Sequence, residues 1–403
     1  MRQITENKKF DIVMFSMSSW YEWKVRGRAN RNWHILSALV KYPRINKILS
    51  CDLLPHNFKK TISVFLKHKR FIGGKTLKSN LFFRLTQIAD NLYVYSAVDS
   101  FIKGEEHTYN NLKEILKFLD FKNIILWSYN PMFSGYFEKF GEKISIFDAV
   151  DNWLWYPGYE AFRERIKKNY EIIEKKADLI FTVSRELVNF FKSRNQVFWI
   201  PNGVDLEAFS LSRVAKIPSD IKKIPKPIAG YTGHINRINI ELVRYLIKKN
   251  KNVSFVFIGP VWKNQKKEIG TLEKYSNVYF LGEKPYSNIP DYVRYFDICI
   301  VPHKLNQLTR FMDPLKIYEY LALGKPIVAT SIPHTLRSES SDELFKTAET
   351  KDKFLKYLRD YLYLEENKTE LIIKRRKLAE KFSWKSRVEE MFKYIDNYLD
   401  EAD

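Results

Sequence analysis

The 403-residue sequence contains only two cysteines, Cys51 and Cys299, and both lie within apolar runs. This scarcity excludes a disulfide framework and a cysteine-based zinc cluster, and it fits a reducing compartment. No run approaches the ~18 to 20 apolar residues that a membrane-spanning helix needs, and the first residues lack the apolar core of a secretory signal. We therefore expect a cytoplasmic protein whose contact with membranes is peripheral.

Acidic residues are also in the minority. The chain has 68 Lys and Arg against 47 Asp and Glu, a formal net charge of +21. Such an excess favours a polyanionic partner, which can be nucleic acid, an anionic membrane surface or a phosphorylated substrate. No RRM, KH, helix-turn-helix or zinc-finger pattern accompanies the charge, so a nucleic-acid-binding protein ranks last. The seven histidines are scattered without ligand spacing, and we expect no metal site.

Short apolar runs alternate with amphipathic helical stretches along most of the chain. This alternation predicts an α/β fold with parallel sheets covered on both faces. The expected strands are residues 10–15, 46–51, 92–96, 123–127, 144–147 and 179–183, then 228–232, 253–258, 278–281, 298–301 and 327–329.

The alternation pauses between Pro201 and Pro227, where an Asn-Gly turn and further prolines indicate an interdomain connection. We predict one Rossmann-like domain over residues 1–203, a second over 204–382, and a C-terminal helix over 383–403 that packs back on the first domain. Ligands of such sheets bind beyond the carboxyl ends of the strands and at domain interfaces, so the two domains are expected to face each other across a cleft.

The most informative stretch is DPLKIYEYLALGKPIVAT, residues 313–330. It predicts a helix that is capped by Asp313 and starts at Pro314. Lys316 falls in the first turn, where backbone N–H groups and the helix dipole favour an anion, and Glu319 follows on the same face. The two side chains can hold a diphosphate and two ribose hydroxyls. The alternative is a solvated lysine paired with its neighbouring glutamate.

Two loops of the second domain add candidates for the same ligand. In GYTGHINRIN, residues 230–239, the glycines allow close backbone approach, His234 follows Gly233, and Arg237 can neutralise a phosphate. In the third segment, residues 277–293, the ring of Tyr286 could contact a base. Taken alone, each loop also reads as an ordinary surface turn.

In order along the chain, these segments resemble a known family. The motifs N-V-x-x-L-G-x-x-x-Y, D-I-x-I-x-P and P-L-K-x-x-E-Y-L-A-x-G-K-P-I-V-A-T are similar to the donor domain of GT-B glycosyltransferases, especially bacterial enzymes of surface-polysaccharide synthesis of the teichuronic-acid and xanthan types. The resemblance extends over residues 148–392, and the first part of the chain matches only loosely.

The resemblance implies a metal-independent hexosyltransferase that moves a sugar from a nucleotide donor, most simply UDP, to a lipid-linked or polysaccharide acceptor in cell-surface glycan synthesis. It implies no cofactor besides the nucleotide-sugar substrate, and a place on the inner face of the cell membrane. The donor residues that it implies are Gly233, His234, Arg237, Tyr286, Lys316 and Glu319. Many retaining members carry a second glutamate where this chain has Phe311, so the stereochemistry stays open.

An inverting transferase needs a base that deprotonates the acceptor hydroxyl. Asp148 and Asp151, in KISIFDAVDNWLWYP, follow a predicted strand of the first domain, and Asp151 is preferred because it lies further out on the loop. Both can equally be turn or N-cap residues. A nucleotide-sugar 2-epimerase of the same fold is the alternative enzyme.

Two segments of the first domain are candidates for the acceptor and the membrane. Trp20, Arg26 and Arg28 lie in a loop where aromatic rings can stack on sugars and arginines can bind the phosphate of a polyprenyl-phosphate-linked glycan. Residues 53–84 contain eight Lys and Arg and no acidic residue, with apolar side chains between them. That pattern suits an anionic membrane surface. Ordinary basic surface is the alternative for both segments.

Overall fold

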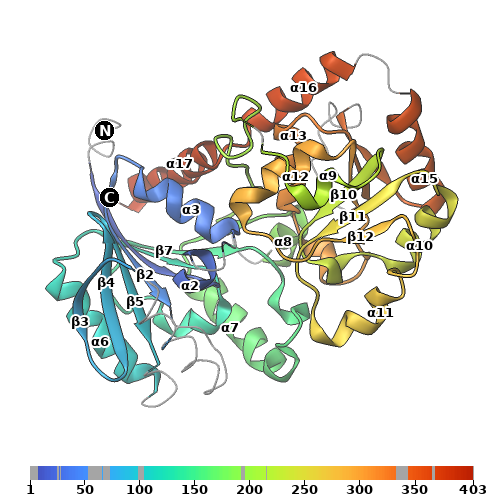
Figure 1. Ribbon diagram of the computed structural model, residues 1–403. Coiled ribbons are helices and arrows are strands. Elements are labelled where there is room, and N and C mark those ends of the chain that lie inside the picture. Colours follow the sequence, from blue (N-terminus) through green and yellow to red (C-terminus); the bar gives the residue numbers. More distant parts are fainter. Residues whose placement is uncertain are drawn as a thin grey trace. The chain divides into compact units, whose positions relative to one another are not determined.

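The computed structural model describes residues 8–24, 27, 29–52, 66, 73–98, 104–191, 196–214, 216–332, 344–364 and 368–402. The chain divides into two compact units (Figure 1). The first consists of Met1–Pro201 with Arg387–Asp403, and the second of Asn202–Ser386. The prediction of an α/β fold with two largely parallel sheets is confirmed.

The first unit is built on a sheet that, in the described part of the chain, has nine strands in the order β3-β4-β5-β2-β1-β6-β7-β8-β9. The strands are β1 (Phe10–Phe15), β2 (Ile45–Asp52), β3 (Lys75–Ser79), β4 (Phe83–Ala89), β5 (Leu92–Ala97), β6 (Ile124–Ser128), β7 (Ile144–Ala149), β8 (Leu179–Thr182) and β9 (Val197–Trp199). The helices are α2 (Trp20–Lys24), α3 (Arg31–Val40), α6 (Glu105–Phe118), α7 (Arg163–Lys176), α8 (Arg185–Phe190) and most of α17 (Trp384–Ala402), with short 3-10 turns η1 (Pro131–Tyr136), η2 (Trp153–Trp155) and η3 (Glu160–Phe162).

Three strands of this sheet were not predicted. β3 pairs with β4, and β4 with β5, in antiparallel register. β3 reads Lys-Thr-Leu-Lys-Ser and is almost entirely exposed, so it lacks the apolar run by which buried parallel strands are recognised. β9 has only three residues, all half-buried, so it also lacks the apolar run that would predict a buried strand.

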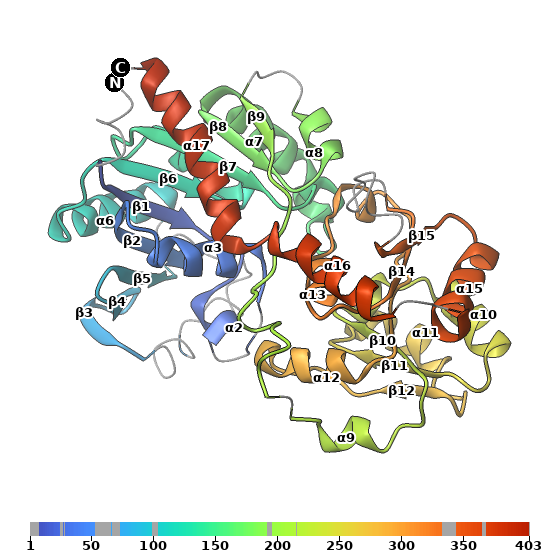
Figure 2. The ribbon, with the colours of Figure 1, turned by 90° about the horizontal axis from the view of Figure 1, so that it is seen from above.

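The C-terminal helix α17 groups with the first unit and lies along its sheet (Figure 2). Ser383 caps the helix as predicted, since its Oγ accepts a hydrogen bond from the Ser386 N–H at 3.0 Å. The predicted apolar stripe is buried and consists of Trp384, Val388, Met391, Ile395 and Leu399. Tyr394 stacks on Phe198 of β9 with ring centroids 3.9 Å apart, so the helix continues the first unit's core.

The second unit has a parallel sheet, and its strands within the described residues follow the order β12-β11-β10-β13-β14-β15. They are β10 (Ile228–Thr232), β11 (Ser254–Ile258), β12 (Val278–Phe280), β13 (Ile298–Val301), β14 (Ile327–Thr330) and β15 (Lys346–Ala348), the last of which was not predicted. The helices are α9 (Ser219–Lys222), α10 (Ile240–Lys249), α11 (Lys266–Gly270), α12 (Ile289–Tyr295), α13 (Leu315–Ala322), α15 (Lys351–Arg359) and α16 (Lys368–Glu380). Shorter turns are η4 (Ile235–Arg237), η5 (Lys263–Gln265), η6 (Tyr286–Asn288), η7 (Thr309–Phe311) and η8 (Asp360–Leu364).

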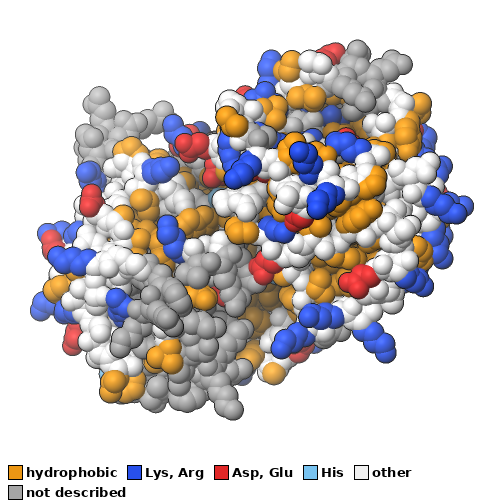
Figure 3. Space-filling view, in the orientation of Figure 1, with side chains coloured by type: hydrophobic (Ala, Val, Ile, Leu, Met, Phe, Trp, Pro, Cys, Tyr) orange, Lys and Arg blue, Asp and Glu red, His pale blue; other side chains and the backbone are white. Residues whose placement is uncertain are grey.

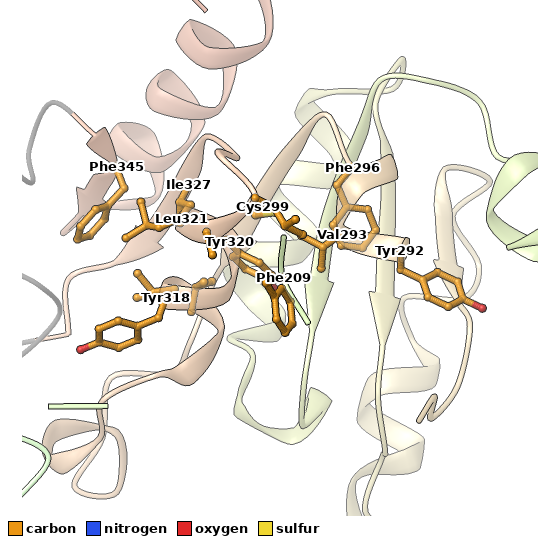
Figure 4. Close-up of a cluster of buried hydrophobic side chains, with 14 of the residues drawn as sticks. Phe209, Tyr292, Val293, Phe296, Cys299, Tyr318, Tyr320, Leu321, Ile327 and Phe345 are labelled. Atoms are coloured by element: carbon orange, nitrogen blue, oxygen red, sulfur yellow. The ribbon is translucent and has the colours of Figure 1, made fainter. Parts of the chain in front are cut away.

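The two faces of this sheet are covered by different helices. α10 and α15 contribute to one buried cluster, and α12, α13 and α16 to the other. The segment between Pro201 and Pro227 was predicted as a connection, but several of its apolar side chains are buried in the cluster that contains α12, α13 and α16: Val204, Phe209, Ile221 and Ile224. Figure 4 shows Phe209 of this segment next to Tyr320 of α13 and Val293 of α12. The sequence pattern missed this because isolated apolar residues among prolines show no period.

Candidate functional site

A glycine loop follows the first strand of the second unit. Gly233 comes directly after β10 with φ +126°, and its N–H donates to the carbonyl of Ile258 at 2.8 Å. A Cβ at this position would lie 3.0 Å from Cε and 3.2 Å from Nζ of Lys316. The missing side chain therefore lets the lysine lie directly against the loop.

Lys316 is the second residue of α13 and is only 9% exposed. Its ammonium group lies 5.1 Å from the ring centroid of Tyr231. The pKa of Lys316 is lowered to about 7, chiefly by burial and also by the nearby Arg237, while Glu319 opposes the shift. A buried amine beside a second cation favours the binding of an anion, which restores the charged form.

Glu319 lies one helical turn further along α13 and is 7% exposed. Burial raises its pKa to about 7. The Tyr286 hydroxyl and Lys316 oppose this shift, and the carboxylate of Asp205 adds to it. The carboxyl group thus lies between a cation and a phenol, in a position to accept hydrogen bonds from the hydroxyls of a ligand.

Arg237 and His234 lie in and beside the 3-10 turn η4. The His234 carbonyl accepts a hydrogen bond from the Tyr231 hydroxyl at 2.9 Å, and the Arg237 carbonyl accepts one from the Lys304 N–H at 2.8 Å. Arg237 is close enough to lower the pKa of Lys316. The structure thus gathers all six predicted donor residues at the carboxyl end of one sheet.

The start of α13 differs from the prediction. The helix begins at Leu315, and Asp313 does not cap it. Instead, the Asp313 carboxylate accepts hydrogen bonds from the Asn202 N–H and the Tyr318 hydroxyl, both at 2.7 Å, while the Asn202 side chain donates to the Asp313 carbonyl at 2.7 Å. Pro314 has an extended ψ of 110°, which moves Asp313 away from the cap position.

Sequence reasoning missed Asn202, Asp205, Tyr231 and His303, although all four adjoin this group of side chains. Asn202 and Asp205 were assigned to the interdomain connection, and Tyr231 is hidden inside an apolar strand. The Asn-Gly turn at Asn202 was the one available signal, and it was interpreted as part of an interdomain connection.

In the first unit, Asp148 lies within β7 and is fully buried. The Arg31 Nε donates to both of its carboxylate oxygens, at 2.9 and 3.1 Å. Burial raises the pKa of Asp148, while Arg31, Trp127 and Tyr129 oppose the shift. The carboxylate is therefore engaged in a buried ion pair, which counts against the idea that it acts as a base on the outer loop.

Asp151 lies two residues beyond β7 and is 7% exposed. It adjoins Tyr170, whose pKa is raised mainly by burial and further by the Asp151 charge. The Tyr170 hydroxyl accepts a hydrogen bond from the Trp153 N–H at 3.0 Å. This contact holds the loop that carries Asp151 against α7.

Of the predicted acceptor residues, Trp20 is 4% exposed and its backbone N–H donates to the Asp52 carboxylate. Its ring packs edge-on against Trp33 at 5.6 Å and Trp23 at 6.2 Å. Trp20 thus belongs to a buried aromatic cluster, because three indoles at this spacing bury each other, and its burial counts against a role in stacking on an acceptor sugar. Arg26, Arg28 and most of residues 53–72 lie outside the described residues.

The sequence of the second unit matches a known family. Residues 226–362 match the family described as "Glycosyl transferases group 1". The chain is also 27% identical over 186 residues to the Bacillus subtilis (strain 168) protein TuaH, which is named as a teichuronic acid biosynthesis glycosyltransferase. That alignment covers 44% of this chain and 47% of TuaH, so the chain matches about half the length of this relative.

Solved structures match over nearly the whole chain. Sucrose-phosphate synthase from Thermosynechococcus elongatus has a TM-score of 0.68 at 12% identity, covering 98% of this chain and 100% of that chain. Anabaena HepE, solved with UDP and glucose, has a TM-score of 0.62 at 13% identity over 96% and 99% of the two chains. These solved structures show that the chain has the GT-B fold of two α/β domains, and residues 226–362 match a glycosyltransferase family.

The described part of this GT-B chain holds no group of three or more His, Cys, Asp or Glu side chains that could bind a metal ion. Cationic side chains and the start of α13 are groups in the second unit that can stabilise negative charge. Within the described residues, no helix is both long and apolar enough to cross a membrane.

Proposed function

We propose that this GT-B chain transfers a sugar from a UDP-activated donor to a glycan acceptor in the synthesis of a cell-surface polysaccharide. The observation that carries the proposal is the arrangement of Lys316, Arg237, Gly233, Glu319 and Tyr286 at one end of the second sheet. A UDP donor is also in keeping with the HepE structure, whose title names UDP and glucose.

Each group has a chemical role in this proposal. Lys316 and Arg237 neutralise the diphosphate, which gains negative charge as the glycosidic bond to the sugar breaks. Gly233 lets the backbone approach the phosphates, and Glu319 accepts hydrogen bonds from the ribose hydroxyls. Tyr286 holds the Glu319 carboxylate and lies beside the base. Phosphate stabilisation by cations needs no metal ion in this scheme.

The first unit supplies the acceptor side of the proposal. Asp151 is the proposed base, because Asp148 is already paired with Arg31. The proposed acceptor is a lipid-linked or growing glycan presented at an anionic membrane surface, and the net charge of +21 supports such a location. TuaH, named for a surface polysaccharide, supports the same acceptor class.

The decisive experiment measures UDP binding by calorimetry for the wild type, Lys316→Ala and Glu319→Ala. We expect each substitution to weaken binding at least tenfold, because each removes a charged partner of the ligand. Lys251→Ala, an exposed lysine of the same unit, should leave the affinity unchanged. Equal affinities for all four proteins would remove α13 from the site.

A panel of UDP- and GDP-sugars, assayed with and without glycan acceptors, tests the reaction itself. Acceptor-dependent release of UDP supports the transferase. Conversion of UDP-GlcNAc without any acceptor would instead identify a 2-epimerase of the same fold. A folded chain that binds UDP and turns over no nucleotide sugar in the panel would contradict the proposal.

A further inference from the structure

One peptide group of the main chain is held at both ends by buried, charged side chains. It joins Pro201, the last residue before the chain enters the second unit, to Asn202, the first residue of that unit. The Pro201 carbonyl accepts a hydrogen bond from Arg31 Nη1 at 3.2 Å. The Asn202 N–H donates to the Asp313 carboxylate at 2.7 Å. Because a cation binds the carbonyl and an anion binds the N–H, both hydrogen bonds are charge-assisted.

In the first unit, Arg31 of α3 is 3% exposed and binds two partners at once. Its Nε donates to both oxygens of Asp148, at 2.9 and 3.1 Å, while Nη1 donates to the Pro201 carbonyl. The planar guanidinium group fixes the angle between these two directions, which a lysine ammonium group does not do. The ion pair with Asp148 therefore orients the arginine toward the Pro201 carbonyl.

In the second unit, Asp313 holds the start of α13. The N-cap position is Pro314, whose side chain makes no capping hydrogen bond, so the position of the first turn depends on neighbouring contacts. The Asp313 carboxylate accepts from the Tyr318 hydroxyl, and its carbonyl accepts from the Asn202 side chain, both at 2.7 Å. Figure 4 shows the Tyr318 hydroxyl pointing away from the apolar cluster. Asp313 thus ties the turn that carries Lys316 to a peptide 111 positions away.

We propose that Asp313 and Arg31 are positioning residues of the donor site, although neither is among the groups proposed to touch UDP. Asp313 fixes the first turn of α13, and Arg31 fixes the peptide to which Asp313 is bound. Together they hold the Lys316 ammonium group where the diphosphate binds. This assignment rests on the proposed function, because it takes UDP as the ligand of α13. Its consequence is that loss of either contact lowers UDP affinity in protein that is still folded.

The first test uses the negative charge of Asp313. On electrostatic grounds alone, removal of an anion would strengthen the binding of a diphosphate. We expect the opposite result: Asp313→Ala should weaken UDP binding about tenfold or more, because α13 loses charge-assisted bonds that locate it. Asp313→Asn keeps an oxygen that can accept both hydrogen bonds, so it should recover most of the affinity.

Asp297→Ala is the matched control for Asp313→Ala. The Asp297 carboxylate also accepts a backbone N–H, that of Ile228 at 2.7 Å, but at the opposite end of β10 from the glycine loop. Its removal should leave the affinity for UDP unchanged.

The second test examines the other end of the peptide without changing the net charge. Arg31→Lys loses the fork that reaches the Pro201 carbonyl, so UDP affinity should fall about threefold or more. Arg44→Lys is the control, since Arg44 also lies in the first unit and its Nη1 donates to both oxygens of Asp396 at 2.7 Å. It should bind UDP like the wild type. The double variant Arg31→Lys/Asp313→Ala should bind no more weakly than Asp313→Ala, because the peptide is then no longer bound to α13.

Calorimetry with UDP measures these affinities, and thermal unfolding shows that each variant is folded at the temperature used. A milder pair of variants serves if Asp313→Ala does not fold. Tyr318→Phe removes one phenol–carboxylate bond and should weaken UDP binding about twofold or more. Tyr292→Phe removes a similar bond to Asp220 in the same unit and should not weaken it.

Wild-type protein that does not bind UDP would overturn the proposed function and the positioning role together. If the wild type binds UDP, four results overturn the positioning role alone. These are equal affinities of Asp313→Ala and Asp297→Ala, or of Tyr318→Phe and Tyr292→Phe, equal affinities of Arg31→Lys and Arg44→Lys, no recovery in Asp313→Asn, and additive losses in the double variant.

Discussion

At the scale of single residues, Lys316 and Glu319 form an unusual pair. They lie one turn apart on α13, both are almost completely buried, and burial brings the pKa of each to about 7 from opposite directions. The charged groups that face them are Arg237 on the lysine side and Asp205 on the glutamate side, with Tyr286 next to the carboxyl group. Near neutral pH, an arriving ligand can therefore change the protonation of either group at little cost in free energy.

We predict that UDP affinity is highest near pH 7 and falls on both sides. Below the pKa of Glu319 the carboxyl group is protonated and accepts hydroxyl hydrogen bonds poorly. Above the pKa of Lys316 the amine is neutral and no longer attracts the diphosphate. Each limb should approach about a tenfold loss per pH unit, as expected for one linked proton. Calorimetry between about pH 5.5 and 9 measures both limbs.

Two variants assign the limbs to their groups. Lys316→Met should flatten the alkaline limb, and Glu319→Gln should flatten the acid limb apart from the ionisation of UDP itself. A pH-independent affinity of the wild-type protein would contradict the linkage.

A second residue-scale prediction separates the two aspartates of the first unit. Asp148→Asn leaves the buried Arg31 without its charged partner, and breaking such a pair typically costs about 3–5 kcal/mol. Thermal unfolding should therefore occur at a lower temperature. Asp151→Asn should leave unfolding nearly unchanged and lower sugar transfer at least 100-fold, because it removes the proposed base. Full turnover by Asp151→Asn would make the base assignment wrong.

At the scale of elements, the loops after β10 and β11 depend on close backbone contact. Gly259 has φ +145°, and a Cβ there would lie 2.0 Å from the carbonyl oxygen of Gly233. We predict that Gly259→Ala lowers stability by about 3 kcal/mol or more, through steric overlap and backbone strain, and also weakens UDP binding. Gly282→Ala is the control, since Gly282 has φ +71° but no atom within 4 Å of its Cβ position.

Thermal denaturation and UDP calorimetry of both glycine variants check this prediction. Gly282→Ala should cost only about 1 kcal/mol, the penalty for a left-handed backbone at a non-glycine residue. If the two variants lose stability equally, the contact between the two loops contributes nothing beyond the backbone conformation.

Elements with strong local patterns were predictable from the sequence, and elements defined by tertiary contacts were not. β10 and β13 coincide with their predicted bounds because buried parallel strands read as unbroken apolar runs. β3, with exposed lysines, is a strand only because β4 pairs with it. The same distinction holds in the site. The Lys316 and Glu319 spacing was visible on one helix, whereas the contact of Asp313 with Asn202 joins residues 111 positions apart.

At the scale of the whole molecule, the net charge of +21 exceeds what the donor site uses. Lys316 and Arg237 account for only two of these charges. The remaining cations are spread over the surface, and Figure 3 shows them on both units. In the proposed function, the polyanion that the protein meets is the acidic phospholipid of a bilayer, and binding there should depend on salt.

We therefore predict that the protein sediments with vesicles of 30% phosphatidylglycerol in phosphatidylcholine at about 50 mM NaCl, and much less at about 300 mM, because screening shortens the range of each charge. Pure phosphatidylcholine vesicles should bind little.

The triple variant Lys67→Gln/Lys69→Gln/Arg70→Gln should lose about 1 kcal/mol per charge, since these residues lie in the basic, apolar-rich segment 53–84. Lys113→Gln/Lys167→Gln/Lys168→Gln removes the same charge from exposed helical positions of the first unit. An equal loss in the two triple variants would show that net charge alone attracts the protein, and retention of full binding by the first would exclude segment 53–84 as the membrane contact.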